Sequence, residues 1–251
     1  TRHEVGVSAI VRHMPLNESH FYQVEPDPLR ADAVRFVLDS TGNRVPEPDL
    51  ISDNPYPNFH DHQAEVFRPG VFYTGFLSLQ QRRGPLNYSA SFHQTYDGGS
   101  LLLAKGFSRQ NLRFNLDNRL TPRLDVSLST FYGRSTNDQA VETREAFNDV
   151  YSVDPEQDLF AKNPDGSPYR VGFEYGTRFD ANPLYALATD LNRADRSRFT
   201  ANGQLRWRML DWLLGEAQYG FDQESATSLQ LTPFGSLSTS FRPLPGSISR
   251  L

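Results

Sequence analysis

Apolar and polar residues alternate with a period of two along several segments of the chain. In residues 86–93 every even-numbered position is apolar and every odd-numbered one is polar, and residues 199–209 repeat the pattern with the apolar residues at odd positions. Because successive side chains of a strand point to opposite faces, this alternation predicts β-strands with one apolar and one polar face. Further strands of this kind are predicted at residues 4–11, 72–80, 112–116, 124–128 and 213–221.

Short and long connections alternate between these predicted strands. The short ones, residues 81–85, 118–123 and 210–211, are mostly built from turn-forming residues. The others are longer: residues 13–70, 97–106 and 135–197, with a small hairpin and Gly turn predicted at 34–43. Loops as long as the first and third are uncommon inside compact domains. Outer-membrane barrels place short turns on one side of the membrane and longer loops on the other. The pattern therefore predicts an all-β fold, an antiparallel transmembrane β-barrel segment with long extracellular loops.

The polar residues of each strand indicate which face meets lipid. Arg206 and Arg208 share a face, and an arginine at mid-bilayer costs about 2–4 kcal/mol in barrel proteins. That face therefore meets water, and Leu205 and Trp207 face lipid. A soluble β-sandwich shows the same alternation, so it stays open as an alternative. Aromatic residues near strand ends suit an interfacial girdle: Tyr96, Phe131, Tyr132, Trp207 and Trp212.

The composition favours strands over helices. Mean hydropathy is -0.57 and the hydrophobic share is 37%, yet the 251 residues include 18 Phe and 11 Tyr. No run approaches the ~18 apolar residues of a transmembrane helix. A net charge of -5 without a basic stripe argues against nucleic-acid binding, and the lack of Cys removes disulfides and thiolate metal sites. The chain starts at Thr1 without a signal peptide, and we expect it to be an excerpt of a longer protein.

Two ordered sets of motifs resemble the SusC/RagA-type family of TonB-linked outer-membrane transporters. The first set is LNYSASF at 86–92, GFSRQNLRFNLD at 106–117, LTPRL at 120–124 and YGRSTND at 132–138. The second is NPLY at 182–185, residues 192–199, LDWL at 210–213 and GFD at 220–222. The resemblance covers about residues 64–222. It implies a barrel of ~22 strands closed by a plug domain. Residues 1–251 would be the first third of this barrel, with the plug and the remaining strands absent.

The resemblance also implies a function. The barrel would import a glycan or peptide across the outer membrane of a Gram-negative bacterium, surrounded by outer-membrane lipid. It would contact the TonB complex through the missing plug and work with a SusD-like surface lipoprotein, and no cofactor is implied. The alternatives are a passive porin-like barrel, since about eight strands can close alone, and a soluble β-sandwich binding module.

Candidate ligand contacts are aromatic residues of the long loops, because aromatic faces bind sugars and peptides. They are Tyr56, Phe59, Phe67, Tyr151, Tyr169 and Tyr175, and packing within the loops is the alternative for each. The segment from His60 to His62 has metal-ligand chemistry but no third His or Cys nearby. Residues 154–158 carry three alternating acids without the Gly of a Ca²⁺ loop. We therefore expect solvated loops and no metal site. Without a nucleophile elbow, a phosphate loop or a spaced acid pair, we do not expect an enzyme.

Overall fold

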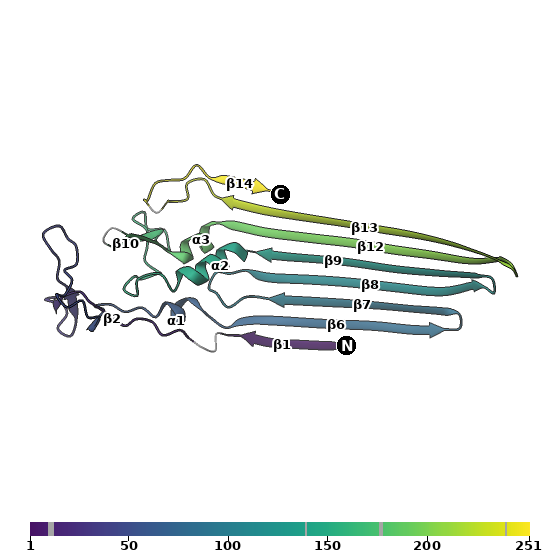
Figure 1. Ribbon diagram of the computed structural model, residues 1–251, viewed down its shortest axis with the longest axis horizontal. Coiled ribbons are helices and arrows are strands. Elements are labelled where there is room, and N and C mark those ends of the chain that lie inside the picture. The colour runs from purple at the N-terminus through teal and green to yellow at the C-terminus, as the bar shows by residue number, and fades with distance from the viewer. Residues whose placement is uncertain (10–12, 139, 176–177, 239) are drawn as a thin grey trace.

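The protein is mostly β, and eight of its strands form one open antiparallel sheet (Figure 1). The computed structural model describes the chain except residues 10–12, 139, 176–177 and 239 and the side chains of 140–143, 174–175 and 178–179. The sheet order is β1-β6-β7-β8-β9-β12-β13-β14. These strands are β1 (Arg2–Ser8), β6 (Gly70–Arg83), β7 (Leu86–Asp97), β8 (Gly106–Thr121), β9 (Leu124–Asp138), β12 (Leu191–Leu210), β13 (Leu213–Thr232) and β14 (Ser247–Arg250). The predicted all-β antiparallel fold is confirmed.

Each strand predicted from the alternation lies in this sheet, but most are longer than predicted. β12 begins at Leu191, eight residues before the alternation starts at Phe199. In that extension both faces of the strand are polar, so no apolar stripe marks it, and its backbone hydrogen bonds to β9 and β13 hold it instead. The first strand ends at Ser8 rather than at residue 11, and residues 10–12 lie outside the described part. β14 was not predicted.

The predicted alternation of short and long connections is confirmed. Three tight turns, residues 84–85, 122–123 and 211–212, lie together at one end of the sheet, which we call the turn end (Figure 1). Gly84 takes a φ of 59°, a conformation that glycine adopts without steric cost. The connections at residues 9–69, 98–105, 139–190 and 233–246 lie at the opposite, loop end.

Apart from the hairpin at 34–43, the long loops fold into short elements that the sequence did not predict. The first loop pairs β2 (Ser19–His20) with β5 (Asn54–Pro55) and β3 (Val24–Pro26) with β4 (Val34–Phe36), and ends in α1 (His62–Val66). The third contains α2 (Ala140–Asp149), β10 (Gly172–Tyr175), β11 (Arg178–Ala181) and α3 (Pro183–Thr189). The predicted hairpin at 34–43 is present, with Leu38 bridging to Arg44 across a turn at Gly42 (φ 87°). In the described part of the chain, no helix has the length and apolar character needed to cross a membrane.

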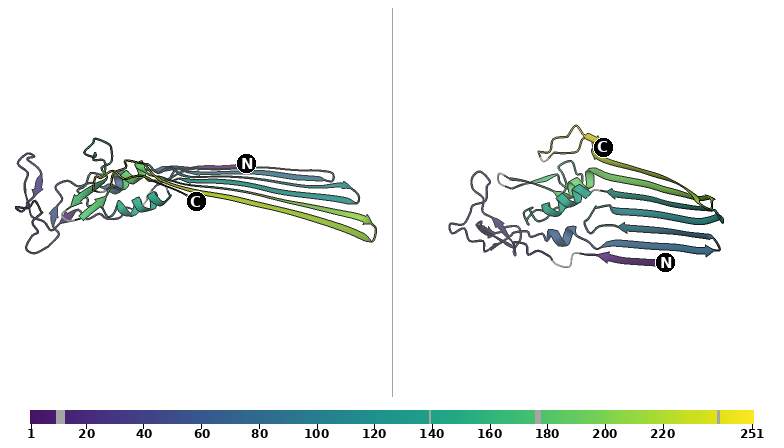
Figure 2. Two further views of the ribbon diagram at one scale, coloured as in Figure 1. Left: turned by 90° about the horizontal axis from the view of Figure 1, so that it is seen from above. Right: turned by 45° about the vertical axis from the view of Figure 1, so that its right-hand side comes forward.

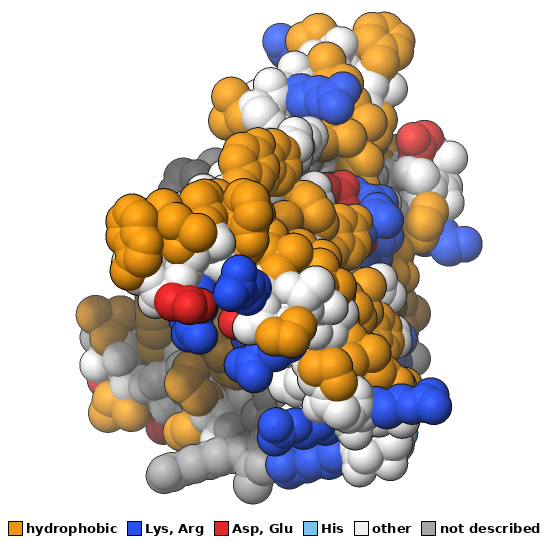
Figure 3. Space-filling model, turned by 90° about the vertical axis from the view of Figure 1, so that its right-hand side faces the viewer, with side chains coloured by type: hydrophobic (Ala, Val, Ile, Leu, Met, Phe, Trp, Pro, Cys, Tyr) orange, Lys and Arg blue, Asp and Glu red, His pale blue; other side chains and the backbone are white. Residues whose placement is uncertain are grey.

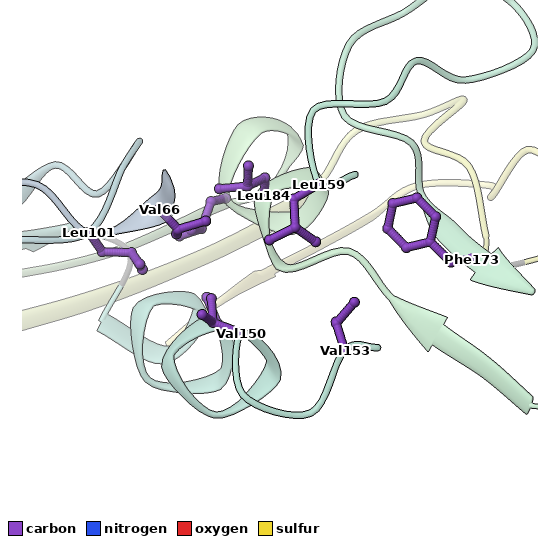
Figure 4. Close-up of a cluster of buried hydrophobic side chains, with 9 residues drawn as sticks. Val66, Leu101, Val150, Val153, Leu159, Phe173 and Leu184 are labelled. Atoms are coloured by element: carbon purple, nitrogen blue, oxygen red, sulfur yellow. The ribbon is translucent and has the colours of Figure 1, made fainter. Parts of the chain in front are cut away.

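The buried hydrophobic core lies among the loops and not on the sheet. Val66 of α1, Leu101 of the second loop and Leu159 of the third meet there with side chains of α2 and α3 (Figure 4). The full cluster is Val66, Leu101, Ala146, Val150, Val153, Leu159, Phe173, Leu184 and Leu187. The sheet itself is a single curved layer with the folded loops at one end (Figure 2). Packing between three loops therefore fixes the loop end, whereas both faces of the sheet stay open.

Candidate functional site

The strand register places the predicted apolar stripes on one face of the sheet. Leu128 of β9 lies opposite both Leu116 of β8 and Gly203 of β12, and Leu116 lies opposite Tyr88 of β7. Directly opposed residues of a sheet share a face. We call this face the apolar wall, and it includes Leu77, Leu79, Tyr88, Ala90, Phe92, Leu112, Phe114, Leu116, Val126, Leu128, Phe199, Ala201, Gly203, Leu205, Trp207, Ala217, Tyr219 and Phe221.

The apolar wall has the height of a bilayer. On β12 it extends from Phe199 to Met209, which at about 3.3 Å per residue is about 33 Å along the strand. A strand tilt of about 40° reduces this to about 25 Å, the height of the apolar band on outer-membrane barrels. Beyond Phe199 the same face becomes polar, where Ser197 lies between Arg134 and Ser225.

Nothing in the described part of the chain covers this wall. Tyr219 is 72% exposed, Leu79 58% and Trp207 48%. A β-sandwich would bury this face under a second sheet, but the three other sheets have two strands each and lie in the loops. Contiguous exposed apolar surfaces of this size mark contact with a membrane or a partner. Among the described residues, no second sheet packs on the apolar wall.

The opposite face, which we call the polar wall, is held by cross-strand ion pairs. Arg198 donates two hydrogen bonds to the Asp222 carboxylate, at 3.0 and 2.6 Å, and the Arg119–Asp125 pair is at 2.9 Å. These side chains are largely exposed and can line a water-filled space. At the turn end, basic side chains gather next to exposed hydrophobic ones (Figure 3). Arginines at this level can keep their guanidinium groups in water beside the apolar band.

Two of the six candidate ligand contacts line one cavity at the loop end. Tyr56 of the first loop and Tyr151 of the third border a space of about 290 Å³, together with His62, Asp154 and other residues. Burial raises the pKa of Tyr56 to about 12. The ring of His20 lies edge-on to the Tyr56 ring, with 4.9 Å between centroids. The cavity therefore combines aromatic and acidic groups from two loops.

Three of the other four candidates have described side chains, and these lie outside the cavity. Phe67 and Tyr169 pack against the buried core, and the Phe67 ring lies 5.5 Å from that of Phe147. Packing within the loops accounts for both. Phe59 is 41% exposed, and the side chain of Tyr175 lies outside the described residues.

The side chains with metal-ligand chemistry are engaged in other contacts. The Asp61 carboxylate caps α1 by accepting from the Ala64 N–H at 3.0 Å. His62 is hydrogen-bonded to the Gln157 carbonyl at 2.7 Å, and His60 to Glu65 at 3.0 Å. Within the described residues, no three His, Cys, Asp or Glu side chains converge as metal ligands would.

A half-buried charge cluster joins the first loop to the third, and sequence reasoning missed it. The Arg44 guanidinium is paired with Glu156, lies 4.0 Å from Asp154, and covers the Phe36 ring at 3.6 Å from its centroid. Burial raises the pKa of Glu156, although Arg44 acts in the opposite direction. Nearby, the backbone N–H of His60 donates a hydrogen bond to the Pro155 carbonyl oxygen at 2.8 Å. We call Phe36, Arg44, Asp154 and Glu156 the Arg44 cluster; it connects the first loop to the third.

Comparison with known proteins supports the fold alone. No family model matches the chain, and no curated protein matches it. Among solved structures, it is similar to that of the RagAB peptide importer in the "closed-closed" state, with a TM-score of 0.57 and 16% sequence identity. The match covers 77% of this chain and 22% of that chain, so this chain spans about a fifth of the transporter's length. The large open sheet of long antiparallel strands is thus found in a transporter.

Proposed function

We propose that residues 1–251 are part of the barrel domain of a SusC/RagA-type, TonB-dependent transporter in the outer membrane of a Gram-negative bacterium. The observation that carries this proposal is the apolar wall, which has bilayer height and an open polar face behind it, with all long loops at one end. The likeness to the RagAB peptide importer supports it. The transported substrate is a glycan or peptide, and the chain is not an enzyme.

In this proposal each surface has one role. The apolar wall faces outer-membrane lipid, and the polar wall faces the lumen. The loop end is extracellular and the turn end periplasmic. A plug domain and the remaining strands belong to other parts of the protein, and the TonB complex acts through the plug. A SusD-like surface lipoprotein covers the loop end. The cavity at Tyr56 and Tyr151 is the first candidate for ligand contact.

Energy-dependent uptake tests the proposal. Cells that carry or lack the gene are grown on peptide or glycan mixtures, and uptake of the nutrient that requires the gene is measured with and without a protonophore. We expect the protonophore or loss of TonB to abolish uptake. Uptake that continues at the same rate would indicate the passive porin-like alternative and contradict the proposal.

A pair of variants tests the cavity. Tyr151→Ala removes a ring from the cavity wall, so we expect reduced uptake at low nutrient concentration. Phe234→Ala is the control, because Phe234 is an exposed aromatic of the fourth loop outside that cavity. Equal uptake by both variants would exclude the cavity as a ligand contact while leaving the transporter assignment intact.

A further inference from the structure

The polar wall is hollowed near its loop end, where arginines gather. A cavity of about 440 Å³ lies over β8, β9 and β12, and we call it the arginine hollow. Its lining includes Arg109, Asn111, Phe131, Ser135, Arg196 and Arg198. Gly133 forms part of its floor, between Asn111 and Arg198 in the register, and the Phe131 ring and the Asn111 side chain lie close over it. The volume falls within the roughly 300–1,000 Å³ of ligand pockets.

Acidic side chains neutralise only some of these arginines. Arg196 is paired with Glu224 at 2.9 Å, and Arg198 with Asp222. Arg109 contacts the Asn111 side-chain oxygen at 3.4 Å and no acid.

Arg113 lies on the same face of β8 as Arg109, four residues further along the strand. It has no acidic partner either. Its guanidinium lies 5.8 Å from the centroid of the Phe131 ring. Neither Arg109 nor Arg113 forms an ion pair within the described part of the chain. The hollow and its border therefore carry two positive charges without a counter-charge.

We propose that the arginine hollow binds carboxylate groups of an acidic cargo, such as a uronic-acid glycan or an acidic peptide; this inference rests on the proposed function. The guanidinium presents its N–H donors in a planar fork that matches a carboxylate. Arg109 lies three residues from the start of β8 at the loop end, so cargo entering there meets it early. Uncompensated positive charge in a concave wall also raises the local concentration of anions. The Phe131 ring supplies an apolar surface for the remainder of the ligand.

The charge and accessibility of the hollow can be measured with an introduced thiol. Ser135 lies between Arg109 and Arg196 in the register, and Ser135→Cys changes one atom. Ser129→Cys, on the same face of the same strand between Asn115 and Asn202, is the matched control. Each variant of the full-length protein is treated on intact cells with anionic sulfonatoethyl and cationic trimethylammonioethyl methanethiosulfonate. The parent protein gives the background, to which residues 1–251 add no Cys.

We expect the ratio of anionic to cationic reaction rates to be about twofold higher at position 135 than at 129, because one unpaired charge, that of Arg109, lies directly opposite Ser135 and within one screening length. Combining Ser135→Cys with Arg109→Gln should remove this difference, whereas Arg113→Gln should change the ratio at position 135 little, because Arg113 lies opposite Phe131, four residues away. Either trigalacturonate, for a uronic-acid glycan, or triglutamate, for an acidic peptide, should slow the modification at position 135, and neutral maltotriose should not.

Three results would overturn the inference. Equal rate ratios at the two positions would show that the hollow has no anion preference. A charge preference without protection by either trigalacturonate or triglutamate would show a positive wall that binds no carboxylate ligand. A thiol at position 135 that neither reagent reaches would show that another part of the protein fills the hollow. Labelling of Asp165→Cys and Asp211→Cys in the same cells tests the membrane orientation separately. If they label on the expected sides, such failures concern the hollow alone.

Discussion

Gly203→Arg should destabilise the membrane-inserted protein by about 2–4 kcal/mol, the cost of an arginine at the bilayer midplane of a barrel. Gly203 lies four residues from Phe199 along β12, which is about 13 Å along the strand and about 10 Å in depth at a tilt of about 40°. In an apolar band of about 25 Å, that position is close to the middle. A Cβ at Gly203 has no neighbour within 4 Å, so a side chain can leave the backbone there without crowding. A steric clash therefore cannot cause the loss.

The matched control is Asn202→Arg, one residue away on the polar wall and beside Gly220, which has no side chain. Gly203→Leu is the second control and should assemble as well as the parent protein, because it adds an apolar side chain toward lipid. The assay is a denaturant titration of the full-length protein in lipid vesicles, together with its amount in the outer membrane. A loss at Asn202→Arg equal to or greater than that at Gly203→Arg would refute the assignment of the two faces.

Two further predictions concern the Arg44 cluster. Arg44→Ala leaves the half-buried Glu156 and Asp154 without their cation, so we expect contact between the first and third loops to weaken by about 1.5–3 kcal/mol; hydrogen exchange at residues 150–157 should accelerate. Arg35→Ala is the control, because the Arg35–Glu25 pair is exposed and worth about 0–1 kcal/mol. Because the pKa of Glu156 is raised above its ordinary value of 4.5 in the folded state, the contact should be most stable below that value and lose stability as pH rises through the raised pKa. Intrinsic-rate-corrected exchange at residues 150–157 should therefore slow on acidification, and Glu156→Gln should remove that dependence; an unchanged pH response in this variant would contradict the assignment to Glu156.

The sequence predicts the strands well where the two faces of the sheet differ. At the level of the apolar band, apolar and polar residues alternate because Leu205 lies on the apolar wall and Arg206 on the polar wall. Above that band both faces are polar, as at Arg196 and Ser197, and the alternation disappears although the strand continues. The parts of the strands that the sequence did not predict are therefore those in which both faces of the sheet are polar.

The loop end could not be predicted in the same way. Its elements are short, and its core comes from three separate loops. Arg44 and Glu156 are 112 residues apart in the chain, and neither stands in a recognisable motif. Residue type alone selected Tyr56 and Tyr151 correctly as loop aromatics, but only the fold shows that they share a cavity. The arginine hollow likewise depends on the strand register that aligns Arg109 with Ser135.

Membrane topology tests the central claim most directly. Single cysteines at Asn58 and Asp165, both exposed at the loop end, are compared with cysteines at Pro85 and Asp211 in the turns. Gly84 is avoided because its positive φ would strain a side chain. Antiparallel strands cross the membrane in alternation, so all three turns share one side. On intact cells, a membrane-impermeant thiol reagent should label Asn58→Cys and Asp165→Cys, and should reach Pro85→Cys and Asp211→Cys only after the outer membrane is opened. Labelling of Asp211→Cys on sealed cells with Asp165→Cys protected would contradict the account.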